Sequence, residues 1–193
     1  MNFWFYCLIY LSVLASVSTE GEKEKVKEAM EKNQVVPDVL PKAPENLLEV
    51  QYGSAKVKLG NVLSPASVAS PPKVFWNGDD NSFYTVCMID PDAPSRTNHK
   101  AREWQHWLVG NIPGNKIEQG EVICPYAGAT PPPGTGLHRY VIVVYKQPGK
   151  IDFNEPRITP AGGNRAKFSV STFASKYKLG DPLAGNFFQA KSD

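Results

Sequence analysis

Short apolar runs separated by turn-forming residues dominate the chain from Leu47 onward. The runs are LLEVQY at 47–52, KVFW at 73–76, FYTVCMI at 83–89, WLVGNI at 107–112 and HRYVIVVY at 138–145. Such spacing is typical of antiparallel β structure. The pattern predicts eight or nine short strands with one or two short peripheral helices. The expected fold class is therefore mainly β, an antiparallel β-sandwich.

Two of these runs are apolar on both faces. Phe83 to Ile89 and Tyr140 to Tyr145 consist almost entirely of Val, Ile, Tyr, Phe and other apolar residues. This composition favours central strands that are covered on both sides. Between Trp76 and Phe83 lies the stretch Asn-Gly-Asp-Asp-Asn at 77–81, whose residues tolerate the positive φ of tight turns. We expect a hairpin at this point.

Helical patterns lie only near the two ends of the chain. Residues 20–32 interleave Glu and Lys, with Val26, Ala29 and Met30 at helical spacing. This pattern predicts a solvated helix that packs lightly on the domain, and a flexible charged leader is the alternative. Residues 167–178, KFSVSTFASKYK, form the second helical pattern.

The second helical pattern has its own expected buried side. Phe168, Phe173 and Tyr177 are the candidates for it, although serine and threonine weaken the pattern. The chain then closes with the two phenylalanines at 187–188, which leaves little room for another element. Residues 47–193 are thus expected to form the sandwich domain, preceded by a charged helical or extended leader at 19–46.

The first 18 residues differ sharply from the rest. They contain no charged side chain, and a charged run follows at once from Glu20. The apolar stretch is shorter than the roughly 20 residues that a membrane-spanning helix needs. Residues 1–18 therefore favour a cleaved signal peptide and a secreted, extracellular protein, with an uncleaved signal anchor as the alternative. We expect no later segment to span a membrane.

Cysteine usage and net charge narrow the picture further. Cys7 would leave with the signal, so Cys87 and Cys124 would remain in an oxidising compartment. A disulfide between them and a pair of buried free thiols are both open at this stage. The formal net charge is only +2, which is too small to indicate nucleic-acid binding. The remaining length suits a single domain.

Two polar segments lie directly beside core strands. The first is DPDAPSR at 90–96, followed by REWQHW at 102–107, and the second is PPPGTGLHRY at 131–140. Proline fixes the backbone of such loops, while glycine permits tight turns. His106 and His138 could donate N–H groups to an anion, and Asp90 could fix the tautomer of a histidine. The combination suits a phosphate or a carboxylate.

These segments resemble the two signature regions of the phosphatidylethanolamine-binding protein family. The resemblance extends in order through REWQHW and RAKFSVSTFASKY and covers roughly residues 47–190. It implies an antiparallel β-sandwich that binds phosphate-type head groups and other small anions in a cavity at one end, without a cofactor, a metal or catalysis. The implied ligand-binding residues are Asp90, Asp92, Pro94, Trp104, His106, Pro131, Pro132, His138 and Tyr140.

The resemblance also assigns roles around this pocket. His106 and His138 would donate hydrogen bonds, Asp90 would orient a donor, and Tyr140 would supply a hydroxyl. Trp104 and the prolines would form the wall. Arg96 and Arg139 would hold the loops together. Asp92 has a second interpretation, because an aspartate often caps a turn where a strand ends.

Two departures from the family pattern change the expected pocket. Many members carry a tyrosine immediately before the Arg-Glu-Trp run, where this chain has Ala101. Animal cytosolic members also carry a C-terminal helix beside the pocket, whereas this sequence stops soon after the residues at 187–190. Both departures lead us to expect a wider and more open cavity.

Other chemistries remain weaker alternatives. Two histidines and an aspartate could bind zinc, but no closely spaced ligand pair such as H-E-x-x-H is present. Ser95 or Thr135 would need a histidine partner to act as a nucleophile, and neither lies in a nucleophile-elbow sequence. Non-catalytic alternatives are a protein partner that binds near the pocket, as for an extracellular serine protease inhibitor or signalling modulator, and an odorant carrier.

Overall fold

The computed structural model describes residues 20–159 and 163–192, so the expected signal peptide at 1–18 lies outside the described residues. The strands in chain order are β1 (Asn46–Leu47), β2 (Glu49–Tyr52), β3 (Ala55–Lys56), β4 (Lys73–Phe75), β5 (Phe83–Asp90), β6 (Trp104–Pro113), β7 (Glu121–Cys124), β8 (His138–Lys146) and β9 (Ala184–Ala190). The helical segments are the described part of an N-terminal helix at 20–32, the short 3-10 helices η1 (Pro65–Val68) and η2 (Ile117–Gln119), and the α-helix α2 (Val170–Lys176).

The strands form two sheets. The large sheet has six strands in the order β1-β9-β8-β5-β6-β7, and the small sheet has three in the order β3-β2-β4. All pairs are antiparallel except β1 with β9, which run parallel. The predicted β-sandwich is therefore confirmed, with one parallel pair at the edge of the large sheet.

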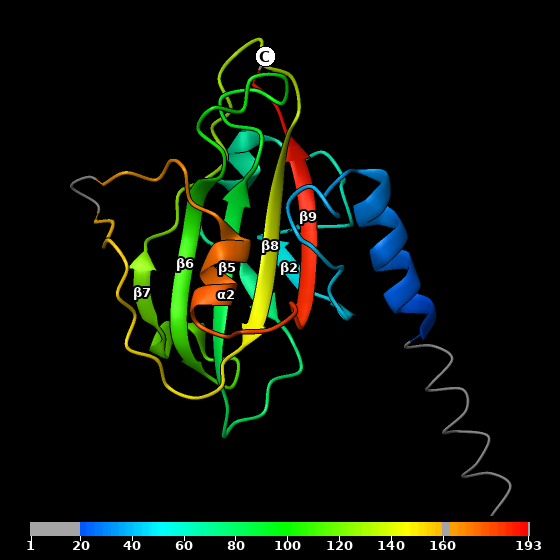
Figure 1. The fold of residues 1–193 in the computed structure, drawn as a ribbon. Helices are drawn as coiled ribbons and strands as arrows, with labels where there is room; N and C mark the ends of the chain where they lie inside the picture. Colours follow the sequence, from blue (N-terminus) through cyan, green and yellow to red (C-terminus); the bar gives the residue numbers. More distant parts are fainter. Residues whose placement is uncertain (1–19, 160–162, 193) are drawn as a thin grey trace, which may run out of the picture.

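The large sheet is covered on both faces, as Figure 1 shows. Its strands β5 and β8 lie in the middle, and every residue of β5 after Phe83 is buried. Val86 and Met88 face an inter-sheet core between the two sheets, while Cys87 and Ile89 face a helix-side core beneath α2. This alternation confirms the prediction of central strands buried on both sides.

The expected hairpin after Trp76 is wrong. Strand β4 pairs with β2 in the small sheet, whereas β5 pairs with β6 and β8 in the large sheet. The segment at 77–82 therefore crosses from one sheet to the other. Asn, Gly and Asp indicate where a chain turns, but they do not determine which strand the chain pairs with after the turn.

The expectation that little room remains after α2 is also wrong. Strand β9 pairs along its whole length with β8, from Ala184 opposite Val144 to Ala190 opposite His138. The phenylalanines at 187 and 188 point to opposite faces and fill both cores. The sequence AGNFFQA conceals this strand, because it contains few β-branched residues and is polar at Asn186 and Gln189.

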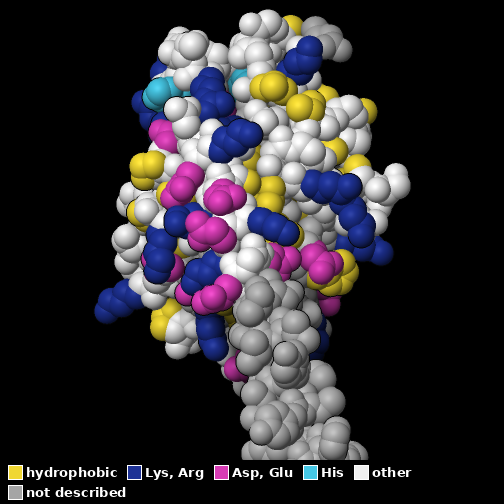
Figure 2. Space-filling model, turned by 90° about the vertical axis from the view of Figure 1, so that its right-hand side faces the viewer, with side chains coloured by type: hydrophobic (Ala, Val, Ile, Leu, Met, Phe, Trp, Pro, Cys, Tyr) yellow, Lys and Arg dark blue, Asp and Glu magenta, His cyan; other side chains and the backbone are white. Residues whose placement is uncertain are grey.

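Both predicted helices are present, and the first packs more firmly than expected. Val26 and Met30 are fully buried in the helix-side core. The charged residues of this helix lie on the outside, where Figure 2 shows Lys and Arg side chains interspersed with Asp and Glu side chains. The leader is thus tied to the sandwich by apolar contacts.

Helix α2 is shorter than the pattern at 167–178 suggested. Ser169 caps its start, because the Ser169 hydroxyl accepts a hydrogen bond from the Thr172 backbone N–H at 3.2 Å. Phe173 is buried against the large sheet, and Phe168 and Tyr177 are only partly buried.

Cys87 and Cys124 are free, buried thiols. Across the large sheet Cys87 pairs with Leu108, and Leu108 pairs with Cys124. Because neighbouring strands lie about 4.8 Å apart, two strand spacings separate the cysteines by about 10 Å. A disulfide requires Cα atoms within roughly 7 Å. The disulfide alternative is therefore wrong. Cys87 packs as a small hydrophobe, whereas the sulfur of Cys124 also accepts a hydrogen bond from Nη1 of Arg165 at 2.9 Å.

The described residues also bear on the membrane question. Between residues 20 and 192, with the gap at 160–162, the structure contains no helix whose length and apolarity would let it cross a bilayer.

Candidate functional site

Three adjacent strands of the large sheet bring the polar residues of the two signature segments together. Asp90 ends β5 and lies opposite Trp104, the first residue of β6. His138 begins β8, the other neighbour of β5. Because neighbouring antiparallel strands end and begin at the same edge of a sheet, residues far apart in the sequence converge at one end of the sandwich.

A cavity of about 180 Å³ lies at this end of the sandwich. Eight of the nine residues implied by the resemblance line it, and Ala93, Ala101 and Thr130 complete the lining. Those eight are Asp90, Pro94, Trp104, His106, Pro131, Pro132, His138 and Tyr140. Ala93 and Thr130 were missed at the sequence level, since small side chains inside a loop carry no chemical signal. That the eight residues contact a ligand remains a prediction.

Asp90 and Thr135 hold His138 between them. The Asp90 Oδ2 atom lies 2.8 Å from Nδ1 of His138, and the Thr135 hydroxyl lies 2.9 Å from its Nε2. The Thr135 hydroxyl donates its single proton to the Pro132 carbonyl at 2.6 Å. It can therefore only accept from His138, so Nε2 of His138 carries a hydrogen. Both ring nitrogens of His138 are occupied by protein partners.

His106 is held differently. Its Nδ1 lies 2.8 Å from the backbone carbonyl of Ala127, which can only accept a hydrogen bond. The Nδ1 atom is thus the protonated one in the neutral ring, and Nε2 is left with a free lone pair. Burial lowers the pKa of His106 below its usual value, against the opposing effect of the Ala127 hydrogen bond. Among the described residues, Nε2 has no hydrogen-bond partner.

The rest of the wall is mainly apolar and aromatic. The Tyr140 ring lies edge-on to His106 with centroids 5.1 Å apart, and it stacks on Phe188 at 5.0 Å. Burial raises the pKa of the Tyr140 hydroxyl, which keeps it a neutral hydrogen-bond donor. Trp104 and the three lining prolines provide stiff walls. Polar groups thus occupy one part of a rigid, otherwise apolar cavity.

Asp92 is the implied ligand residue that does not line the cavity. It is fully buried behind the site, where its Oδ1 accepts from Nη2 of Arg139 at 2.6 Å and its Oδ2 accepts from Nε of Arg139 at 2.9 Å. Strand alternation explains this placement: His138 and Tyr140 face the cavity, so Arg139 between them faces the opposite side of the sheet. Asp92 therefore supports the site through Arg139.

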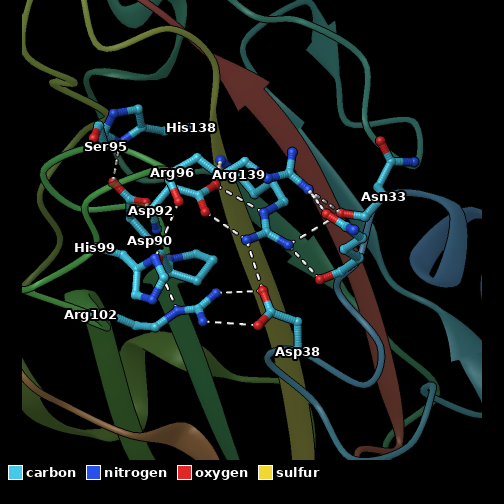
Figure 3. A network of polar contacts seen from close by, with 12 residues as sticks. Asn33, Asp38, Asp90, Asp92, Ser95, Arg96, His99, Arg102, His138 and Arg139 are labelled. Atoms are coloured by element: carbon cyan, nitrogen blue, oxygen red, sulfur yellow. Dashed lines mark hydrogen bonds and ion pairs between the residues drawn. The ribbon is translucent and has the colours of Figure 1, made fainter.

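The leader reaches the same network, as Figure 3 shows. Arg139 donates from Nη1 to the backbone carbonyls of Asn33 and Gln34, and from Nη2 to Asp38 at 3.0 Å. Asp38 also pairs with Arg102, whose Nε donates to the Pro91 carbonyl at 2.8 Å.

Arg96 contacts the leader as well. Its Nη2 donates to the Asn33 carbonyl at 3.1 Å and to the Gln34 side chain at 2.8 Å. Arg96 and Arg139 thus hold loops together, as the resemblance implied. Sequence reasoning missed the leader as their partner, because some of the acceptors are backbone carbonyls and the others, Gln34 and Asp38, meet these arginines only through the tertiary fold.

The charges around the cavity limit what it can bind. Among the described residues that line it, none is Lys or Arg. Within the described part of the chain, no three His, Cys, Asp or Glu side chains gather to form a metal site. Thr135 does contact a histidine, but its proton points to the Pro132 carbonyl rather than to the ring. The hydroxyl is therefore not activated as a nucleophile in this arrangement.

Fold and cavity together define a β-sandwich protein with a small, rigid pocket at one end of its large sheet, in which polar groups occupy one part of an otherwise apolar wall. The sequence profile of the phosphatidylethanolamine-binding protein family matches residues 42–188. This chain belongs to that family, which confirms the resemblance seen in its signature segments. Residues 1–41 and 189–193 lie outside the match.

Individual relatives agree with this assignment. The chain is 38% identical over 188 residues to a Drosophila melanogaster protein named "Putative odorant-binding protein A5", covering 96% of this chain and 90% of that protein. The structure of a carboxypeptidase Y inhibitor complexed with its cognate proteinase is similar, with a TM-score of 0.75, 27% identity, and coverage of 89% of this chain and 97% of that chain. A phosphatidylethanolamine-binding protein from Plasmodium vivax shares the fold, with a TM-score of 0.74, 23% identity, and coverage of 87% and 98%.

Proposed function

We propose that this protein is a secreted, non-enzymatic binding protein whose cavity holds a phosphate-type or carboxylate anion, such as the head group of phosphatidylethanolamine or the polar end of a small amphiphile. The observation that carries the proposal is the convergence of His106, His138, Asp90 and Tyr140 on one rigid cavity. The Tyr140 hydroxyl and, when its Nε2 is protonated, the His106 ring offer hydrogen bonds to anionic oxygens, and the nearby Asp90 carboxylate suits an ammonium group.

The size of the cavity favours a head group over a whole lipid. Its volume of about 180 Å³ is well below the roughly 300–1,000 Å³ of pockets that enclose drug-sized ligands. An anionic group with a short substituent fits such a space. Any acyl chain would extend past Pro132, which is exposed at the mouth.

Nuclear magnetic resonance of the histidine side chains tests this proposal. The protein is titrated with phosphoethanolamine and with inorganic phosphate while the ring signals of His106 and His138 are followed. Saturable shifts are expected in both, whereas the exposed His99 serves as an internal reference that stays unmoved. A His138→Ala variant that is folded should lose the response, because the ring that anchors Asp90 at the cavity is gone.

The source of the anion is resolved by competition. If short-chain phosphatidylethanolamine displaces phosphoethanolamine from the same histidines, the ligand includes a lipid head group. If only free phosphate and carboxylates bind, the cavity serves small anions. Histidines that stay unmoved up to millimolar ligand would contradict the proposal. In that case a protein-interaction role would lead, since a similar structure is that of a carboxypeptidase Y inhibitor with its proteinase.

A second candidate function is carriage of a small odorant-like molecule. It is favoured by the 38% identity to a Drosophila melanogaster protein whose name includes "odorant-binding". The apolar wall of Trp104, Pro131 and Pro132 would contact the carbon skeleton, and a hydroxyl or carboxyl of the molecule would meet His106. A wholly apolar molecule would leave the polar groups unsatisfied. Competition of small alcohols and carboxylic acids against phosphoethanolamine distinguishes this role.

A further inference from the structure

The hydrogen-bond partners of the two cavity histidines determine how the site can meet a negative charge. Nδ1 of His138 and Oδ2 of Asp90 lie 2.8 Å apart and share one hydrogen, and Nε2 of His138 donates to the Thr135 hydroxyl. With this arrangement the pair is either an imidazolium with a carboxylate or a neutral ring with a carboxylic acid. In both cases the pair carries no net charge. It therefore supplies no positive charge to an anion.

Among the described lining residues, His106 is the remaining group that can become positively charged beside an anion. Because Nδ1 of His106 donates to the Ala127 carbonyl, the neutral ring presents the bare lone pair of Nε2. A lone pair repels the oxygens of sulfate, a phosphate dianion or a carboxylate. It attracts only a group that brings a hydrogen. No Lys or Arg among the described lining residues can substitute for that hydrogen.

We propose that the cavity takes up one proton with each anion, and that this proton lies in the hydrogen bond between Nε2 of His106 and the ligand. This inference rests on the proposed anion-binding function. It adds that the affinity for the anion is regulated by pH, because binding requires a proton. When the anion itself cannot carry a proton, the proton is on the ring. When the anion is a phosphate monoester, the ligand can supply it.

The surroundings of His106 agree with this proton coupling. The free ring is neutral near pH 7, because burial lowers its pKa from a usual value of about 6.5. The charged and titratable groups that act on the ring are Asp90, which favours protonation, and Arg165 and His138, which oppose it. Tyr140 lies against the ring as a neutral phenol. A bound anion adds a negative charge beside Nε2, so it raises the pKa of His106 and draws in the proton.

Sulfate and phosphate separate the ligand proton from the ring proton. Calorimetric titrations with sodium sulfate, between pH 5 and pH 8.5, are run in two buffers of different ionisation enthalpy. We expect uptake of one proton per sulfate above the pKa of free His106, and a roughly tenfold loss of affinity for each pH unit in that range. Phosphate should lose less affinity between pH 6 and 7, where it still carries a proton of its own.

Variants assign the proton to one residue. His106→Gln places an amide N–H near the position of Nε2, so sulfate binding by this variant should show no dependence on pH. His99→Gln is the matched control: His99 is exposed in a loop, and its replacement should leave the tenfold slope unchanged. Should His106→Gln fail to fold or to bind, the ring signals of wild-type His106 decide the matter, since saturating sulfate must raise its pKa.

The outcomes separate this inference from the function it rests on. Absence of both sulfate and phosphate binding at every pH would contradict the proposed function itself. Binding without proton uptake, or a slope that persists in a folded and binding-competent His106→Gln variant, would overturn the proton coupling and leave the anion site in place. Protonation of His138 instead of His106 on sulfate binding would overturn it as well.

Discussion

The buried pair of Arg139 and Asp92 offers a test of how the site is supported. Both side chains are only 1% exposed. Asp92 accepts three hydrogen bonds from Arg139: from the backbone N–H at 2.9 Å, from Nε at 2.9 Å and from Nη2 at 2.6 Å. Replacing Asp92 with Asn keeps the shape but removes the charge and turns one acceptor into a donor that faces the guanidinium.

The expected loss of stability follows from that geometry. Removing one partner of a buried ion pair typically costs about 3–5 kcal/mol, because the other charge stays buried and uncompensated. Asp38 still contacts Arg139 at 3.0 Å, so we expect the lower end, about 3 kcal/mol. With a urea m-value of about 2 kcal/mol/M, the midpoint of unfolding falls by about 1.5 M. Urea denaturation followed by tryptophan fluorescence measures it.

Two comparisons sharpen this prediction. Asp38→Asn is the matched control: the Asp38 side chain is 37% exposed, so its replacement should cost about 1 kcal/mol or less. Acid adds a second signature. Burial alone would raise the pKa of Asp92, but the hydrogen bonds and charge of Arg139 outweigh it and lower that pKa. The contribution of Asp92 is therefore complete above the unfolded pKa of about 3.9 and is lost as the pH falls through the lower native pKa.

A small effect would refute this reasoning. If Asp92→Asn lowers the urea midpoint by less than about 0.5 M, Arg139 is not an uncompensated buried charge in the variant. The same conclusion follows if the acid-sensitive part of the stability is unchanged in Asp92→Asn. Either result would mean that water or another residue takes the place of the carboxylate.

Three further predictions concern Glu103, the cysteines and Ala101. Burial raises the pKa of Glu103 to about 7, so the native state holds this proton more tightly than the unfolded chain and stability is lost as the pH rises from about 4.5 to 7. Glu103→Gln keeps an acceptor for the Val170 N–H and should raise stability at pH 8 by up to about 3 kcal/mol in thermal unfolding, whereas an unchanged pH dependence would contradict the shift. Burial raises the pKa values of Cys87 and of Cys124, the latter to about 11. Peptide mapping after thiol labelling at pH 8 should therefore find both cysteines unmodified in the native protein and both labelled in denaturant. An unlabelled pair in denaturant would indicate a disulfide. Ala101→Tyr adds a hydroxyl to the cavity wall and should tighten phosphate binding about tenfold, which corresponds to about 1.4 kcal/mol, and weaker binding in calorimetry would show that the ring blocks the mouth.

The sequence by itself determined the class of fold and most of the cavity lining. Apolar runs with a period of two identify strands, and strands without polar positions must lie between two layers. DPDAPSR and GTGLHRY lie directly beside such strands, and their resemblance to the signature regions of the family implied a cavity at one end of the sandwich. Eight of the nine residues that the resemblance implied line the cavity. Five of these eight residues belong to strands β5, β6 and β8, and the three prolines lie in the loops beside those strands.

Only the tertiary structure decided which segments meet. The turn at 77–81 is visible in the sequence, but the change of sheet after it depends on long-range strand pairing. Strand β9 is stable because β8 pairs with it, and its own sequence does not indicate a strand. Asp92 turns away from the cavity because it pairs with the Arg139 guanidinium, which is itself held behind the site by the carbonyls of Asn33 and Gln34. Backbone groups carry no residue-specific signal, and so the state of His106, fixed by the Ala127 carbonyl, could be known only from the fold.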